Sequence, residues 1–249
     1  MATDLRTLTA ANSKRWNAAK LTRGPEFIPV AKRLAAPSAK ARYQKIAEAT
    51  GVPWFAIAVI HEREASQRWD RQLGQGDPLN QVSTHVPKGR GPFLNHDSDP
   101  PLQDAFYRGA LDALIDCAPY AAKWGDWSPG GTMTLLEQYN GLGYAARGLP
   151  SPYIWSGTDQ YRAGKYVADH VYDSSVVDTQ LGCAGLILAM IQVDPTITFT
   201  GATITPVPAP KPIPVPPEIK LPPPAAPPPP GLAPTFWGRV ADLFRPKGN

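Results

Sequence analysis

The longest apolar run in the N-terminal half of the chain, residues 52–60, ends abruptly in the polar sequence His61-Glu-Arg-Glu64. Pro53 suits the first turn of a helix, so the pattern predicts a helix that begins there, is buried for about two turns and ends at the surface. A carboxyl group at the edge of a low-dielectric wall has a raised pKa, which suits a general acid. The run therefore predicts either an acidic active-site wall or simply the surface end of a helix.

Helical spacing separates the two acidic residues of this segment. Glu64 follows Ile57 and Ile60 at the i−7 and i−4 positions and so continues the buried face. Glu62 points about 200° away from Glu64. Glu64 is therefore the preferred candidate acid and Glu62 the alternative.

Helical patterns dominate the first 195 residues, and the predicted fold class is mainly α. Apolar residues at helical spacing or helix-like boundaries predict helices at residues 38–50, 102–122, 132–139, 161–171 and 176–190, with a weaker helical pattern at 4–20. Residues 26–34 are expected to form a short amphipathic turn. Glycine and proline interrupt residues 74–93, where a short alternation at 81–86 predicts one arm of a small β-hairpin. Such a loop after a helix end is a typical place for an active-site wall.

Proline content divides the chain into expected units. Half of the 30 prolines lie between residues 206 and 234, which predicts a solvated polyproline linker without a core. The expected units are a lead-in at 1–37, a catalytic domain at 38–195, a linker at 196–234 and a short amphipathic helix at 235–249. The apolar face Phe236–Phe244 of that helix is a candidate for membrane-surface or protein contact, packing on the core and disorder being the alternatives.

Composition narrows the partners and cofactors. The net charge of +4 favours an anionic partner, but the scattered basic residues and the lack of RNA-binding or zinc-finger motifs argue against nucleic acid. His61-Glu-Arg-Glu64 lacks the second histidine of a zinc-protease helix, so neither metal nor cofactor is expected. Cys117 and Cys183 are expected to be buried small residues, and His85 and His96 to be loop residues.

The sequence also bears on where the chain is made. Its first residues show no signal-peptide pattern, and no run approaches the length of a membrane span. The expectation is a monomer made in the cytoplasm without a signal peptide.

Residues after the predicted active-site helix favour a carbohydrate substrate. Tyr139, Asn140 and Tyr144 surround a glycine stop at the end of a predicted helix. Sugars stack on aromatic rings and hydrogen-bond to amides. Glycosidic cleavage needs one carboxyl group to protonate the leaving oxygen. Together with the candidate acid and the loop after it, these residues therefore suggest a carbohydrate substrate and glycosidic cleavage.

Four segments together resemble the lysozyme-like superfamily, specifically bacteriophage and prophage peptidoglycan hydrolases related to goose-type lysozymes and lytic transglycosylases. They are Ala58-Val-Ile-His-Glu-Arg-Glu-Ala-Ser66, Gly76-Asp-Pro-Leu-Asn80, Val86-Pro-Lys-Gly-Arg-Gly-Pro-Phe93 and Glu137-Gln-Tyr-Asn-Gly-Leu-Gly-Tyr144. The resemblance covers approximately residues 40–190. It implies a lysozyme-like α+β fold that binds peptidoglycan glycan strands and cleaves between N-acetylmuramic acid and N-acetylglucosamine, acting on the cell wall after release or delivery.

The resemblance also implies roles for individual residues. Glu64 is the expected general acid, and Asp77 or Asp70 is the candidate second carboxylate that hydrolysis by the lysozyme mechanism requires. The expected substrate-binding residues are Asn80, Gln81, Tyr139, Asn140 and Tyr144, and Tyr144 is also expected to hydrogen-bond the catalytic carboxyl or to stack.

Two departures from the family pattern are visible. The family's Glu-Ser pair is here Glu64-Ala65-Ser66, and Leu79–Thr84 replaces the Gly-Leu-Met-Gln segment of transglycosylases. They leave open whether the reaction is hydrolysis or transglycosylation. A non-catalytic peptidoglycan-binding module and an amidase or peptidase are the alternative functions.

Overall fold

A computed structural model describes residues 3–168 and 171–200, which form a mainly α-helical fold with a two-stranded antiparallel sheet. The α-helices are α1 (Leu5–Ala18), α2 (Gly24–Leu34), α3 (Pro37–Thr50), α4 (Trp54–Ala65), α5 (Ala105–Leu111), α6 (Pro129–Asn140), α7 (Pro152–Trp155) and α8 (Cys183–Val193). The strands are β1 (Lys165–Ala168) and β2 (Val171–Asp173), and shorter helical turns lie at Asp112–Asp116, Ala121–Lys123 and Ala145–Arg147.

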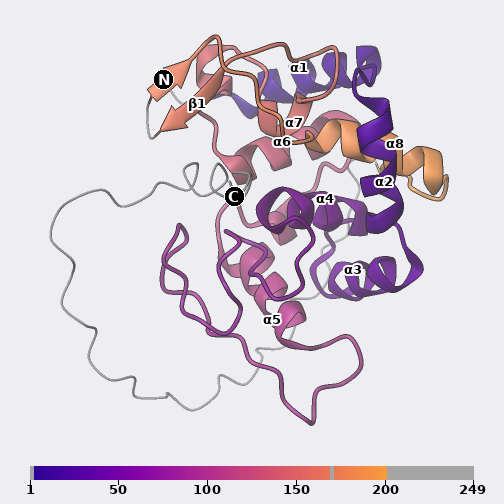
Figure 1. The fold of residues 1–249 in the computed structure, drawn as a ribbon, viewed down its shortest axis with the longest axis vertical. Coiled ribbons are helices and arrows are strands. Elements are labelled where there is room, and N and C mark those ends of the chain that lie inside the picture. The colour runs from indigo at the N-terminus through magenta and orange to yellow at the C-terminus, as the bar shows by residue number, and fades with distance from the viewer. Residues whose placement is uncertain (1–2, 169–170, 201–249) are drawn as a thin grey trace, which may run out of the picture.

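Helix α4 lies in the middle of the molecule. In Figure 1 it separates α3 and α5 from α1, α6, α7 and the hairpin, and it contacts α2, α3, α6 and α8. Every residue from Phe55 to Ile60 is buried, which explains why this helix is apolar on all sides until its last turn. The end of α4 is therefore the place where a polar group emerges from the core.

The first 37 residues take part in the same core. Helix α1 packs along α6 and α2 packs along α8, and Phe27 of α2 is fully buried. A side chain at Gly185 of α8 would have its Cβ 2.3 Å from the Phe27 ring, so glycine is needed for this close helix approach. The segment expected to be a short turn at 26–34 is instead a complete helix.

One helix prediction and one strand prediction were wrong. Residues 161–171 form no helix, because Gly164 has a φ of +106° and leads into β1, where Tyr166 pairs with Tyr172 of β2. Residues 81–86 form no strand; backbone bonds from Thr84 and His85 to Asp77 hold them in a turn. The small sheet is thus far along the chain from the loop that was expected to contain it.

Two helices differ in their bounds from the predictions. The helix expected over 102–122 ends as an α-helix at Leu111 and continues as a wider turn to Asp116, shortly before Pro119, whose ring disfavours a preceding helix. The helix expected over 176–190 begins only at Cys183.

The two cysteines agree with the prediction, and the predicted C-terminal elements lie beyond the described residues. Cys117 and Cys183 are buried free thiols, as expected. None of the helices in residues 3–168 and 171–200 has the length and apolar character needed to cross a bilayer. The proline-rich segment from residue 206 and the terminal helix expected at 235–249 lie outside the described residues.

Candidate active site

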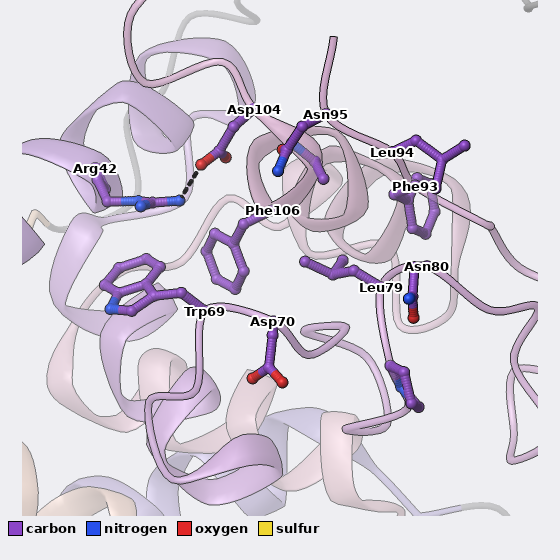
Figure 2. A pocket seen from close by; sticks show the side chains of 12 residues that line it. Arg42, Trp69, Asp70, Leu79, Asn80, Phe93, Leu94, Asn95, Asp104 and Phe106 are labelled. Carbon is purple, nitrogen blue, oxygen red and sulfur yellow. Dashed lines mark hydrogen bonds and ion pairs between the residues drawn. The ribbon is translucent and has the colours of Figure 1, made fainter.

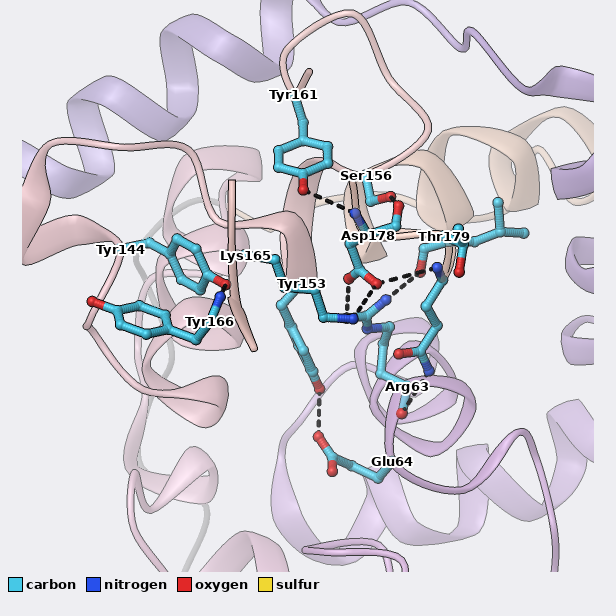
Figure 3. Close-up of polar contacts among 12 residues, drawn as sticks. Arg63, Glu64, Tyr144, Tyr153, Ser156, Tyr161, Lys165, Tyr166, Asp178 and Thr179 are labelled. Atoms are coloured by element: carbon cyan, nitrogen blue, oxygen red, sulfur yellow. Dashed lines mark hydrogen bonds and ion pairs between the residues drawn. The ribbon is translucent and has the colours of Figure 1, made fainter. Parts of the chain in front are cut away.

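The last turn of α4 carries Glu64, whose carboxyl group lies near Tyr139 of α6 and Tyr153 of α7. The helix ends at Ala65 because Ser66 adopts a left-handed conformation, with φ 50°. Glu64 is partly exposed, and the Tyr153 hydroxyl of α7 donates a hydrogen bond of 2.9 Å to its Oε1 (Figure 3). A carboxyl group with one firm donor and some solvent access can exchange a proton with a ligand.

Burial raises the pKa of Glu64 to about 7, and the Tyr153 hydrogen bond and the Arg63 charge only partly oppose this rise. The surrounding atoms are mostly apolar or neutral, so the charged form loses more hydration than its neighbours replace. Near neutral pH a large fraction of Glu64 is therefore protonated and able to donate.

A glycine in the following loop brings the backbone against Glu64. Gly76 has a φ of +70°, and a Cβ at this position would lie 2.5 Å from the Glu64 carbonyl oxygen. Only glycine combines this left-handed conformation with such a close approach. The loop after α4 is thus fitted onto the helix end that carries the candidate acid.

The tyrosines expected to bind the substrate fall into two places. Tyr139 is partly exposed, donates a 3.4 Å hydrogen bond to the Leu73 carbonyl and interacts electrostatically with Glu64. Tyr144 does not donate to Glu64; its hydroxyl instead accepts a 3.0 Å bond from the Tyr166 backbone, and its ring packs edge-on against Tyr166 (Figure 3). Tyr139 therefore lies beside the candidate acid, whereas Tyr144 supports the hairpin.

Glu62 points away from Glu64 and Tyr153, as the helical spacing predicts. Its carboxylate pairs with Arg33 of α2 at 2.8 Å, and its side chain is 16% exposed. Arg33 also donates to the Gln67 side chain. Glu62 thus fastens α2 to the end of α4, which accounts for its position without a catalytic role.

The two aspartates considered as a second carboxylate are both bonded to loop residues. Burial opposes the charged form of Asp77, but hydrogen bonds from the His85 and Thr84 backbones and from the His85 ring hold its pKa below the usual range. Asp70 is exposed and pairs with Arg68 at 2.9 Å. Asp77 closes the loop at residues 77–85, and Asp70 is an open surface group.

Asn80 lies in a pocket of about 600 Å³ that does not include Glu64 (Figure 2). Phe106, Phe93 and Leu79 give the pocket an apolar floor. The Asn80 side chain has no hydrogen-bond partner among the described residues, and Asn95 uses only its carbonyl oxygen, on the Ala105 amide. The amide of Asn80 and the amino group of Asn95 are therefore available to a ligand in this pocket.

The charged groups of the pocket are already paired. Arg42 stacks on the Trp69 ring, with its guanidinium carbon 4.1 Å from the ring centroid, and pairs with Asp104 (Figure 2). Asp70 pairs with Arg68. The pocket therefore suits a neutral ligand with amide or hydroxyl groups better than an ion.

The remaining expected residues are more exposed. Gln81 is exposed, and its backbone carbonyl accepts a 2.9 Å bond from Gln72. Asn140 is the last residue of α6 and is partly exposed. In the described parts of the chain, no group of three or more His, Cys, Asp or Glu side chains is placed to hold a metal ion.

Three residues of the site were not found from the sequence: Tyr153, Arg63 and Asp178. Tyr153 donates to Glu64, and Arg63 stacks on the Tyr153 ring and pairs with Asp178. Tyr153 and Asp178 lie in stretches that carry no motif, and Arg63 reads as an ordinary basic residue at a helix end. The aromatic residues Tyr153 and Trp155 are the only visible feature of that stretch, and they do not indicate a partner.

Comparison with known proteins gives no family assignment: no family model matches the chain, and no curated protein or solved structure matches it.

Proposed function

We propose that the protein is a lysozyme-like peptidoglycan glycosidase in which Glu64 protonates the oxygen of the bond between N-acetylmuramic acid and N-acetylglucosamine. The observation that carries the proposal is a partly exposed carboxyl at the end of a buried helix, with a pKa of about 7 and a hydrogen bond from Tyr153. A general acid works best when its pKa lies near the working pH.

The surroundings of Glu64 favour a mechanism with one carboxylate. Asp77 is held by Thr84 and His85 and Glu62 by Arg33, so neither is free to attack the sugar or to activate water. Glu64 first gives its proton to the leaving oxygen as the glycosidic bond breaks. A hydroxyl or acetamido oxygen of the substrate then bonds to the anomeric carbon. In the hydroxyl case its proton passes to Glu64; in the acetamido case water opens the cyclic intermediate at the anomeric carbon and gives its proton to Glu64.

The pocket around Asn80 is proposed to bind a sugar of the same glycan strand. Part of its lining, Trp69, Asp70 and Pro78 to Asn80, comes from the loop after α4, which Gly76 fits against the Glu64 backbone. The apolar floor suits a sugar face, and the amide of Asn80 and the amino group of Asn95 suit hydroxyl or acetamido groups.

Turnover of purified cell walls by two isosteric variants tests this proposal. Glu64→Gln should lower turnover at least about 100-fold because a general acid is lost, whereas Glu62→Gln should stay within a few-fold of wild type. Wild-type turnover should fall as the pH rises through about 7, where Glu64 loses its proton.

Mass spectrometry of the products identifies the reaction: reducing ends indicate hydrolysis, and anhydro-muramic ends indicate transglycosylation. Full activity of Glu64→Gln would rule out the proposed acid. Binding of wild-type protein to walls without product release would favour the non-catalytic alternative.

A further inference from the structure

A buried ion pair lies directly behind the Tyr153–Glu64 hydrogen bond. Arg63 of α4 and Asp178, which precedes α8, are 3.4 Å apart, and each side chain is only 1% exposed. Arg63 also donates to the Leu181 carbonyl at 3.0 Å. Two segments more than 100 residues apart in sequence are therefore joined next to the candidate acid (Figure 3).

The guanidinium of Arg63 reaches Glu64 through the tyrosine ring. Its central carbon lies 4.6 Å from the centroid of the Tyr153 ring, and the hydroxyl of that ring donates to Glu64 at 2.9 Å. A cation over an aromatic face is attracted to the ring and restricts its orientation. By stacking on the ring, Arg63 thus orients the Tyr153 hydroxyl that donates to Glu64.

Asp178 is fixed from several directions. Its carboxylate accepts a 3.0 Å bond from Lys165 of β1 in addition to the contact with Arg63. Its backbone amide donates to the Tyr161 hydroxyl at 3.0 Å, and its carbonyl accepts from Ser156 at 2.7 Å. Lys165 of β1 and the segment between α7 and β1 therefore decide where the negative partner of Arg63 lies.

We propose that the Arg63–Asp178 pair positions Glu64: Arg63 orients Tyr153 by stacking on its ring, and Asp178 holds the Arg63 guanidinium in place and balances its charge. The inference rests on the proposed function for its effect on turnover, but its effect on Glu64 itself does not depend on catalysis. Neither Arg63 nor Asp178 is required to touch the substrate, so both are positioning residues.

The other groups that face Glu64 are neutral. They are Tyr139 of α6, Tyr153 of α7 and Cys183 of α8, and burial raises the pKa of all three. Arg63 is therefore the charged side chain that acts on Glu64, and it favours the ionised acid. Changing the two members of the pair should move the titration of Glu64 in opposite directions.

The test is the titration of Glu64 in the full-length protein, followed by NMR of ¹³C-labelled glutamate carboxyls and assigned with Glu64→Gln. Asp178→Asn leaves Arg63 unbalanced and should move the titration down by about half a pH unit or more. Arg63→Met removes the cation and should move it up by a similar amount. The matched control is Arg33→Met, which breaks the pair with Glu62 on the other face of α4 and should leave the titration of Glu64 unchanged.

The second measurement is the kinetics of cell-wall turnover by a variant that keeps the positive charge at position 63. Arg63→Lys should leave the Glu64 titration near its wild-type position but lower kcat several-fold at unchanged KM, because the planar stacking on Tyr153 is lost. Shifts of the same sign in Asp178→Asn and Arg63→Met, or an unchanged kcat in Arg63→Lys, would overturn the inference. If Asp178→Asn or Arg63→Met fails to fold, the kcat of Arg63→Lys decides whether the inference holds. Inactive wild-type protein would refute the proposed function but leave the NMR test of the inference valid.

Discussion

Replacing Glu137 by glutamine should stabilise the protein at alkaline pH and have little effect in acid. Glu137 of α6 is 1% exposed at the contact with α1, where its Oε2 accepts a 3.3 Å bond from the fully buried Asn12. The other oxygen, Oε1, and Asn12 Oδ1 are both buried without a partner among the described residues. A proton on Glu137 would supply the missing donor between these two acceptors.

The magnitude follows from the titration of Glu137. Burial raises its pKa from 4.5 to about 7, although the Asn12 bond and the nearby Arg15 charge oppose the rise. An acid with a raised pKa contributes stability that is present below its unfolded value and is lost as the pH rises through its folded value. Between pH 4 and pH 9 the loss is roughly 3 kcal/mol. Glutamine keeps the shape, can donate to Asn12 Oδ1 and cannot ionise.

Urea unfolding at a series of pH values measures the effect. At pH 5 the two proteins should agree within about 0.5 kcal/mol, and at pH 9 Glu137→Gln should be more stable by roughly 3 kcal/mol. Glu48→Gln is the matched control, because Glu48 is a largely exposed acid paired with Lys45. A Glu137→Gln protein whose stability falls with rising pH as steeply as that of wild type would show that Glu137 is not the protonated partner of Asn12.

Three further changes test the site and its support. Tyr153→Phe removes the hydrogen-bond donor that favours ionised Glu64. The alkaline limit of cell-wall turnover should therefore move to higher pH, and kcat should fall roughly tenfold. An unchanged pH profile would contradict the hydrogen bond. Gly76→Ala should destabilise the protein by about 2 kcal/mol or more, because the new Cβ clashes with the Glu64 carbonyl in addition to the left-handed strain. The control Gly51→Ala has the same strain but open space around its Cβ, so it should cost only about 1 kcal/mol. Equal losses of unfolding free energy in urea would exclude the clash. Burial lowers the pKa of His61 to about 4, so the free energy of unfolding should fall by roughly 3 kcal/mol as the pH is lowered from above 6.5 to 4. At pH 6, NMR should find a neutral ring protonated on Nε2, which donates to the Arg68 carbonyl. A charged His61 ring at that pH would refute the lowered pKa.

The sequence by itself was sufficient for the central helix and the choice between its two acids. The apolar run at 52–60 produced α4 within one residue of its expected start, and the spacing from Ile57 and Ile60 placed Glu64 and Glu62 on different sides. Both results depend on helix geometry within two turns of one segment, which local sequence determines.

Local sequence was insufficient for the region after residue 160. Residues 161–171 carry a mixture of aromatic and small residues that fits a short helix or a strand, and Gly164 and the pairing of Tyr166 with Tyr172 select the hairpin. That pairing lies next to Tyr144, more than 20 residues earlier. The choice between helix and strand thus depended on packing partners that a sequence window does not contain.

The tertiary structure alone decided what surrounds Glu64. Tyr153 lies 89 residues after Glu64, and Asp178 lies 115 residues after Arg63, so no spacing rule connects them. Arg63, Tyr153 and Asp178 are buried polar residues that need partners, but the sequence does not say which of many distant groups will supply them. Folding brings α4, α7 and the segment before α8 together, and that juxtaposition turns a carboxyl at a helix end into a candidate general acid with a donor, a raised pKa and a buried charge pair behind it.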